Sequence, residues 1–165
     1  MRILFIFSIF ISLFLQLGCN HPTSATDYQN TLVIDKLTNP DQETTPALYQ
    51  QIQKANQLIE ELDLLIIEIQ KTDEWPEAVE LMETAMKESR SIVSNLKLLQ
   101  FENNLLMNFK VDYENTLTTY ANGLQLQLEG IELWDSQKTT EGFKQTDLAK
   151  QMLKQYYEQI KYNFQ

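Results

Sequence analysis

A regular apolar stripe between residues 48 and 69 constrains the fold of this chain more than any other feature. Apolar residues recur there at alternating spacings of four and three, namely Leu48, Ile52, Ala55, Ile59, Leu62, Ile66 and Ile69. This spacing places them along one side of an α-helix, as in the seam of a coiled coil or a helical bundle. Such a stripe must be buried against other helices, so the sequence predicts an all-α fold.

The first helix is expected to begin at Thr45-Pro46, with the threonine as N-cap and the proline at the first helical position. It is expected to end near Lys71-Thr72. Near that end, four further apolar residues lie outside the stripe, namely Leu58, Leu64, Leu65 and Ile67. A helix that is apolar on most sides is normally buried on most sides, so we expect this stretch to lie deep in the protein.

A second helix is expected directly afterwards, because Asp73 can cap it and Pro76 suits its first turn. Its apolar stripe is formed by Val79, Met82, Met86, Val93 and Leu96. Glutamates recur every three residues at Glu74, Glu77, Glu80 and Glu83. We interpret these glutamates as a solvated face of the helix.

The chain has no glycine or proline between Pro76 and Gly123, and an apolar stripe stays in phase across Asn103-Asn104. A single helix of roughly 60 residues, extending about 85 Å, would satisfy this pattern. A tight turn at residues 102–104 would instead give an ordinary four-helix bundle. Usual helix lengths favour the turn, whereas the unbroken phase favours one helix. We expect an antiparallel bundle of three helices with one very long central helix, or of four helices, and we favour the continuous or kinked long helix.

Gly123 and Gly130 lie seven residues apart and therefore share one face of a helix. They either allow another helix to approach closely or mark a weak point in their own helix. Residues 135–140 read as a loop, and a last helix is expected at residues 141–162. Its stripe is formed by Leu148 or Ala149, with Met152, Leu153, Tyr156, Ile160 and Phe164.

The formal net charge of −10 argues against nucleic acid as a partner, because phosphate binding requires a basic surface. The same charge argues against docking to anionic lipid through a basic patch. The chain has one histidine, His21, and one cysteine, Cys19, and both precede the predicted helices. Without them, the helices cannot supply a His–Cys or Ser–His pair, a zinc site or a histidine-containing di-iron site. We predict no catalytic residues, no metal site and no cofactor, and hence a protein that is not an enzyme.

Carboxylates alone could still do acid–base chemistry or hold calcium if two of them met in a groove. The candidates are Glu60, Glu61, Asp63, Glu68, Asp112, Glu114, Glu129 and Glu132. Their spacing does not require such a site, so we interpret them as solvated surface. Most aromatic residues follow the apolar stripes and are expected in the core. Tyr157 and Tyr162 fit the last stripe poorly, which makes them candidates for exposed contacts with a partner.

The first residues of the chain have the pattern of an export signal. Arg2 is followed by an apolar run from Ile3 to Leu15 that only two serines interrupt. This run is short for a membrane-spanning helix and suits the apolar region of a signal peptide. It ends in the sequence Leu15-Gln16-Leu17-Gly18-Cys19, which resembles the lipobox of bacterial lipoproteins. Gly18 and Cys19 match the lipobox, whereas Gln16 and Leu17 depart from its usual residues.

The resemblance implies that residues 1–18 are a signal peptide, that lipid is attached to the Cys19 sulfur, and that cleavage precedes this cysteine. Two or three acyl chains would then anchor the protein stably in a membrane of the cell envelope. Asn20, which follows the cysteine, favours the outer membrane over the inner membrane by the same resemblance. Two alternatives stay open: cleavage after Thr23-Ser24-Ala25, which would release a soluble periplasmic protein, and an uncleaved N-terminal anchor.

Residues 19–45 are rich in Thr, Asn, Asp, Pro and Gln, which predicts a lipidated N-terminus and flexible tether. Leu32-Val33-Ile34 interrupts this composition and could dock on the helical domain, which is expected at residues 46–165. A tethered helical surface without catalytic residues predicts an envelope lipoprotein that binds another envelope protein as an adaptor or assembly factor. The alternative is a periplasmic module that binds a small ligand or cation between its helices. An enzyme that uses carboxylates alone ranks third.

Overall fold

The computed structural model describes residues 39–72 and 75–163. Residues 1–38, 73–74 and 164–165 lie outside this described part. Several predicted features therefore fall outside it, namely the predicted signal peptide, Cys19, His21, most of the predicted tether with Leu32-Val33-Ile34, the predicted cap at Asp73, and Phe164.

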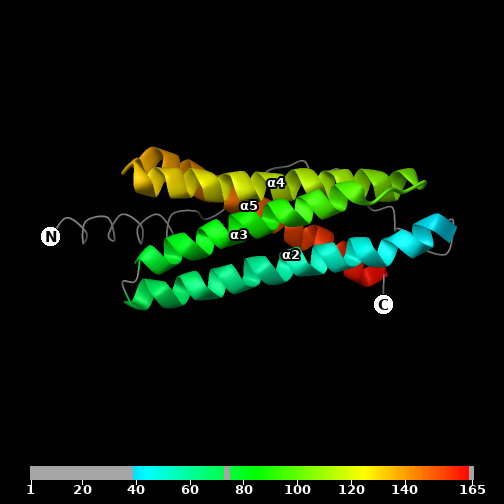
Figure 1. Ribbon diagram of the computed structural model, residues 1–165, viewed down its shortest axis with the longest axis horizontal. Coiled ribbons are helices and arrows are strands. Elements are labelled where there is room, and N and C mark those ends of the chain that lie inside the picture. Colours follow the sequence, from blue (N-terminus) through cyan, green and yellow to red (C-terminus); the bar gives the residue numbers. More distant parts are fainter. Residues whose placement is uncertain (1–38, 73–74, 164–165) are drawn as a thin grey trace. The chain divides into compact units, whose positions relative to one another are not determined.

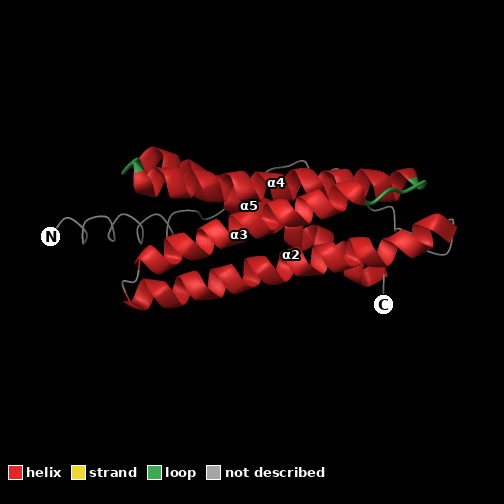
Figure 2. Ribbon diagram, in the orientation of Figure 1, coloured by secondary structure: helices red, strands yellow, loops and turns green. Residues whose placement is uncertain are grey.

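The described chain forms four α-helices: α2 (Asn39–Thr72), α3 (Trp75–Leu98), α4 (Asn104–Glu132) and α5 (Ser136–Asn163) (Figure 1). No strand occurs among the described residues (Figure 2). Each helix packs against the next in the chain, and α5 also packs against α2, which closes the bundle. The prediction of an all-α helical bundle is confirmed, in its four-helix form.

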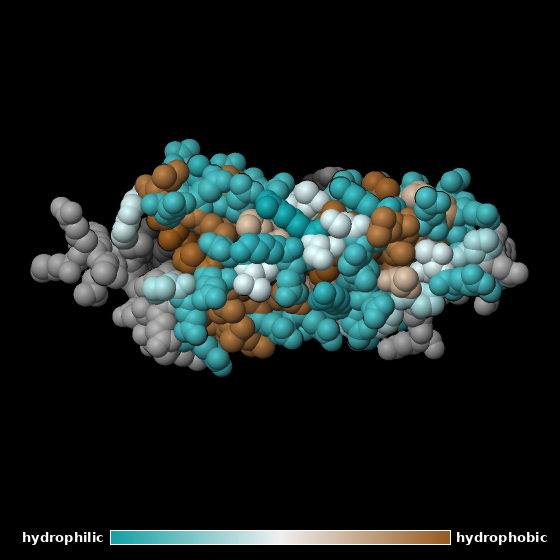
Figure 3. Space-filling model, viewed as in Figure 1, coloured by the Kyte–Doolittle hydropathy of each residue, from teal (hydrophilic) through white to brown (hydrophobic). Residues whose placement is uncertain are grey.

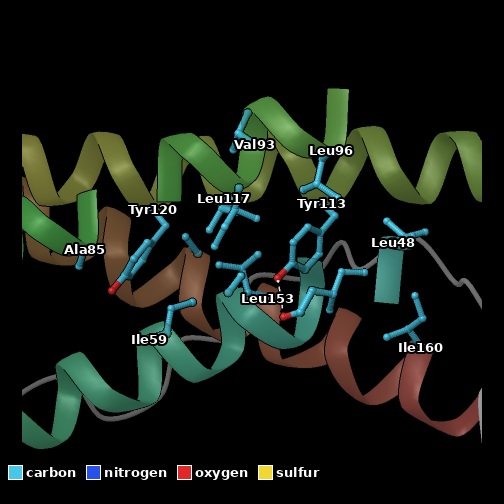
Figure 4. Packing of buried hydrophobic residues seen from close by; sticks show 14 of the residues in the cluster. Leu48, Ile59, Ala85, Val93, Leu96, Tyr113, Leu117, Tyr120, Leu153 and Ile160 are labelled. Atoms are coloured by element: carbon cyan, nitrogen blue, oxygen red, sulfur yellow. Dashed lines mark hydrogen bonds between the residues drawn. The ribbon is translucent and has the colours of Figure 1, made fainter. Parts of the chain in front are cut away.

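The core of the bundle receives large apolar side chains from all four helices (Figure 4). The most deeply buried are Leu48 and Ile52 of α2, Ile92 and Leu96 of α3, Leu106, Tyr113, Leu117 and Tyr120 of α4, and Ile160 of α5. The Tyr113 hydroxyl donates a hydrogen bond to the backbone carbonyl of Ile52, at 3.4 Å. Burial raises the pKa of both Tyr113 and Tyr120 well above the ordinary tyrosine value.

The prediction of one continuous helix across Asn103-Asn104 is wrong. Helix α3 ends at Leu98 and α4 begins at Asn104, and the chain reverses between them. Asn103 caps α4, because its side-chain oxygen accepts hydrogen bonds from the backbone nitrogens of Leu105, at 2.8 Å, and Leu106, at 3.2 Å. Phe101, inside the turn, is buried in the core. The stripe residues Leu96, Leu106 and Phe109, on either side of the turn, are buried as well, so their spacing does not reveal the reversal.

The first helix begins at Asn39 rather than at Thr45-Pro46, so Pro46 lies inside it. A proline there cannot donate the usual backbone hydrogen bond and would normally end or kink the helix. Two hydroxyls support this turn, because Thr44 donates to the Pro40 carbonyl and Thr45 to the Asp41 carbonyl. Asp41 and Thr45 are buried, so this turn is held by tertiary contacts that the local sequence does not reveal.

Helices α4 and α5 approach each other closely at three glycines. A Cβ atom added at Gly142 of α5 would lie 2.7 Å from both the backbone nitrogen of Gln127 and the carbonyl oxygen of Gly123. One added at Gly130 would lie 2.6 Å from the backbone nitrogen of Thr139. Gly123 and Gly130 therefore allow the close approach of another helix, one of the two roles that their spacing predicted.

The last helix also begins earlier than predicted, at Ser136 instead of residue 141. Asp135 caps it, because its carboxylate accepts a hydrogen bond from the Lys138 backbone nitrogen at 3.0 Å. Of the two candidates for the stripe, Ala149 is buried and Leu148 is exposed. Met152, which was also expected in the stripe, is exposed because the buried side of α5 continues through Leu153 instead.

Candidate functional site

The second half of α2 carries an outward-facing set of apolar side chains, formed by Leu64, Leu65 and Ile67 and called here the α2 apolar run. Leu64 is 65% exposed and Ile67 is 52% exposed. The prediction that this stretch lies deep in the protein is wrong. Residues Leu62 and Ile69 face the bundle and are buried, and a helix turns by about 100° per residue, so Leu64 and Ile67 point away from it.

Acidic side chains surround the α2 apolar run. Glu60 and Glu68 lie one turn before and one turn after Leu64, and Asp63 lies one turn before Ile67. The Asp63 carboxylate pairs with the Lys150 ammonium of α5, with a closest distance of 3.1 Å. Figure 3 shows apolar side chains at the surface near the end of α2, where α3 begins. Hydrophilic side chains surround them. The surface here is therefore apolar with an anionic rim.

A second exposed apolar feature is the connection between α4 and α5, where Leu133 and Trp134 form what we call the hairpin tip. Trp134 is 76% exposed. The Trp134 backbone nitrogen donates to the Ile131 carbonyl at 3.3 Å, and the Asp135 nitrogen donates to the Gly130 carbonyl at 2.8 Å. This pair of hydrogen bonds is the Schellman motif, which places the residue after the helix in the left-handed region.

Trp134 occupies that left-handed position, with a φ of 56°. Glycine is the usual residue there, and a side chain costs about 1–2 kcal/mol in this conformation. Burial does not offset the cost, because the indole is largely exposed. A strained and exposed tryptophan is a candidate functional residue, since tryptophan is enriched among residues that dominate protein interfaces. Figure 1 draws the hairpin tip at the same end of the bundle as the end of α2.

Tyr157 and Tyr162, the two tyrosines predicted as exposed contacts with a partner, differ in how exposed they are. Tyr157 is partly buried against the core cluster, and the Lys161 ammonium lies 5.9 Å from the centre of its ring. Tyr162 is 80% exposed near the end of α5. They lie on the half of α5 away from the hairpin tip, so the structure does not bring either of them to that tip. Cys19 lies outside the described residues.

Three of the carboxylates that could have formed an acid–base or calcium site, Asp63, Glu114 and Glu129, pair with lysines instead. The buried Glu114 lies 3.2 Å from the Lys110 ammonium, which also donates to the Leu99 carbonyl at 3.0 Å. Hydrogen bonds from Gln125 and Lys138 lower the pKa of Glu129. Within residues 39–72 and 75–163, no group of three or more His, Cys, Asp or Glu side chains is arranged to hold a metal ion.

Sequence reasoning missed the outward direction of Leu64 and the strain at Trp134. The first could have been found from the helical period, because Leu64 and Ile67 fall outside the stripe of fours and threes. The second had no local signal, because a helix C-terminus in the left-handed conformation normally shows itself by a glycine or asparagine.

Comparison with known protein families, with curated proteins and with solved structures finds no match for this chain. In the part of the chain that the structure describes, no helix is both long and apolar enough to cross a membrane.

Proposed function

We propose that this protein is a lipid-anchored lipoprotein of the bacterial cell envelope whose helical bundle binds another envelope protein. The observation that carries the proposal is the outward-facing Leu64 and Ile67 on α2. Large apolar side chains that a helix directs away from its own core lose contact with water only when a partner covers them. The exposed Trp134 at the same end of the bundle supports a protein partner, because tryptophan supplies much of the energy of such interfaces.

The anchor in this proposal is lipid on Cys19, as the lipobox-like residues before it suggest. The α2 apolar run begins about 38 Å along α2 from Asn39, since a helix rises about 1.5 Å per residue. The end of α2 nearest the tether and the proposed binding surface are thus at opposite ends of that helix. A binding surface at the end of α2 away from Asn39 suits a protein that bridges a membrane and a partner. Asn20 after the cysteine favours the outer membrane as the site of anchoring.

Site-specific photo-crosslinking in the producing cell tests the binding surface. A photoreactive amino acid placed at Leu64 is expected to give a discrete adduct with one partner. The same amino acid at Leu148 is the matched control, because Leu148 is also an exposed leucine in a helix but lies outside the α2 apolar run. The same adducts at both positions, or none at Leu64, would contradict the proposed binding surface.

The anchor is tested separately with Cys19→Ala. We expect this variant to leave the membrane fraction while its helix content by circular dichroism stays unchanged. Mass spectrometry of the mature N-terminus should show an acylated Cys19 in the unmodified chain. A variant that stays in the membrane fraction would show that the apolar N-terminal segment anchors the protein instead.

A further inference from the structure

We infer that the partner segment that covers the α2 apolar run is a cationic amphipathic helix, with lysine or arginine on both sides of an apolar stripe. This inference rests on the proposed function and adds the chemistry of the partner. The reasons are the charge around the run, the spacing of its apolar residues and the poor fit of other occupants.

The charge of α2 around the run, and of the neighbouring stretch of α3, is negative, and on the α5 side Lys150 pairs with Asp63. Between Gln57 and Ile69 of α2, and between Pro76 and Met86 of α3, the sequence contains no lysine or arginine. The same stretches carry the exposed carboxylates Glu60, Glu61, Asp63, Glu68, Glu77, Glu80 and Glu83. Lys87 comes directly after the second stretch and pairs with Glu83 at 3.3 Å. A surface of this sign attracts a positively charged partner and repels a negative one.

The spacing of the run fits a helix as its occupant. Leu64 and Ile67 are three residues apart, so they stand side by side on the solvent face of α2. Glu60 and Glu68 lie along the same face on either side of Leu64. A partner helix can lay an apolar stripe on Leu64 and Ile67 while long basic side chains at its borders reach the two glutamates.

A second copy of this chain is a poor occupant, because a two-fold interface brings the same surface of both copies together. Pairing the run with itself in parallel sets Glu60 and Glu68 against the same glutamates of the other copy, and an antiparallel pairing centred on Leu64 sets Glu60 against Glu68 of the other copy. An anionic lipid surface is disfavoured for the same reason, since like charges repel. The charge therefore selects a basic partner among the occupants that an apolar surface could take.

Binding of designed peptides to the full chain, purified in a non-ionic detergent, tests this inference. One fluorescent peptide carries a helical stripe of leucines with lysine elsewhere, and its matched control has glutamate in place of every lysine. Fluorescence anisotropy, corrected for binding to detergent alone, should show binding of the lysine peptide only. The affinity should fall as salt is added, because salt screens the attraction.

Three variants place this binding on the α2 apolar run. The double change Leu64→Gln and Ile67→Gln should weaken binding of the lysine peptide by about tenfold or more. The double change Glu60→Gln and Glu68→Gln should also weaken it and reduce its dependence on salt. Leu148→Gln, on α5, should leave the affinity unchanged. Equal binding of the glutamate peptide, or binding that none of the α2 changes affects, would overturn the inference.

The crosslink from Leu64 separates failure of this inference from failure of the proposed function. A discrete adduct whose mapped partner segment has apolar residues flanked by lysine or arginine supports both. A discrete adduct with a segment that lacks basic residues overturns the cationic helix and leaves the proposed function standing. The absence of a specific adduct overturns the proposed function, and the inference falls with it.

Discussion

The carboxylate of Asp41 accepts a hydrogen bond from the backbone nitrogen of Asn103, at 3.0 Å. Its other oxygen accepts one from the Glu102 nitrogen, at 2.8 Å. Asp41 is buried in the first turn of α2, whereas Asn103 caps α4. One side chain therefore fixes the turn between α3 and α4 and ties it to the beginning of the first helix.

Asp41→Ala should destabilise the protein by about 2 kcal/mol, because it leaves two part-buried backbone donors without their charged acceptor. The expected result is a lower midpoint of urea unfolding with an unchanged slope. Asp41→Asn is the matched control. It keeps one acceptor oxygen and should cost less than the alanine variant. A loss below about 0.5 kcal/mol for Asp41→Ala would show that water or another group replaces the carboxylate.

Gly142→Ala should destabilise the bundle by about 2 kcal/mol or more, although alanine is the better helix former. The added methyl group would lie 2.7 Å from backbone atoms of α4, which cannot move aside as a flexible side chain could. Thermal unfolding followed by circular dichroism measures the effect. Asn122→Ala, at an exposed position of α4, should be neutral or stabilising. A stability of Gly142→Ala equal to that of the unmodified chain would contradict the close approach.

Trp134→Gly should stabilise the fold by up to about 1 kcal/mol, because glycine adopts the left-handed conformation without strain and its greater freedom when unfolded offsets only part of the gain. Trp134→Phe should leave stability nearly unchanged, since phenylalanine keeps the strain. Unfolding temperatures of the two variants compare these effects. A destabilised glycine variant would mean that the indole makes stabilising contacts that outweigh its backbone strain.

Stability should decline at alkaline pH because burial raises the pKa of Tyr113 and Tyr120. The folded state favours the neutral hydroxyl, so the full stability is present below the ordinary tyrosine pKa of about 10 and falls as the pH rises above it. Each buried tyrosine should contribute a loss of about 1.4 kcal/mol per pH unit there. Urea unfolding at several pH values measures this slope. Tyr120→Phe should make it shallower, and an unchanged slope would contradict the prediction.

The sequence predicted the helices and the buried stripe because both depend on spacing along a single segment. Leu48, Ile52 and Leu62 are buried as their spacing required, since residues three and four apart share a helix face in any bundle. Spacing along one segment also gave Gly123 and Gly130 two alternative roles, namely close approach of another helix or a weak point in their own helix. Their positions on one face follow from the sequence, but whether another helix lies against them does not.

The chain reversal before Asn104 could not be predicted from spacing, because stripe residues on both sides of the turn are buried. Asp41 stabilises this reversal, because its carboxylate accepts a hydrogen bond from Asn103, which lies 62 residues away in the sequence. The same hydrogen bonds of Asp41 fix the first turn of α2 in place. The local signal at Thr45-Pro46 predicted a later beginning for this helix. A hydrogen bond between distant segments leaves no periodic pattern in either of them.

For the candidate site, the sequence determined that apolar residues encircle the second half of α2 and that carboxylates accompany them. Only the tertiary structure decided which of these residues are exposed. Exposure depends on how many neighbouring helices surround α2, and the bundle covers the side with Leu62 and Ile69 while leaving Leu64 and Ile67 uncovered. The left-handed backbone at Trp134 likewise follows from the turn that brings α5 back against the glycines of α4, because that close packing fixes where the chain must reverse.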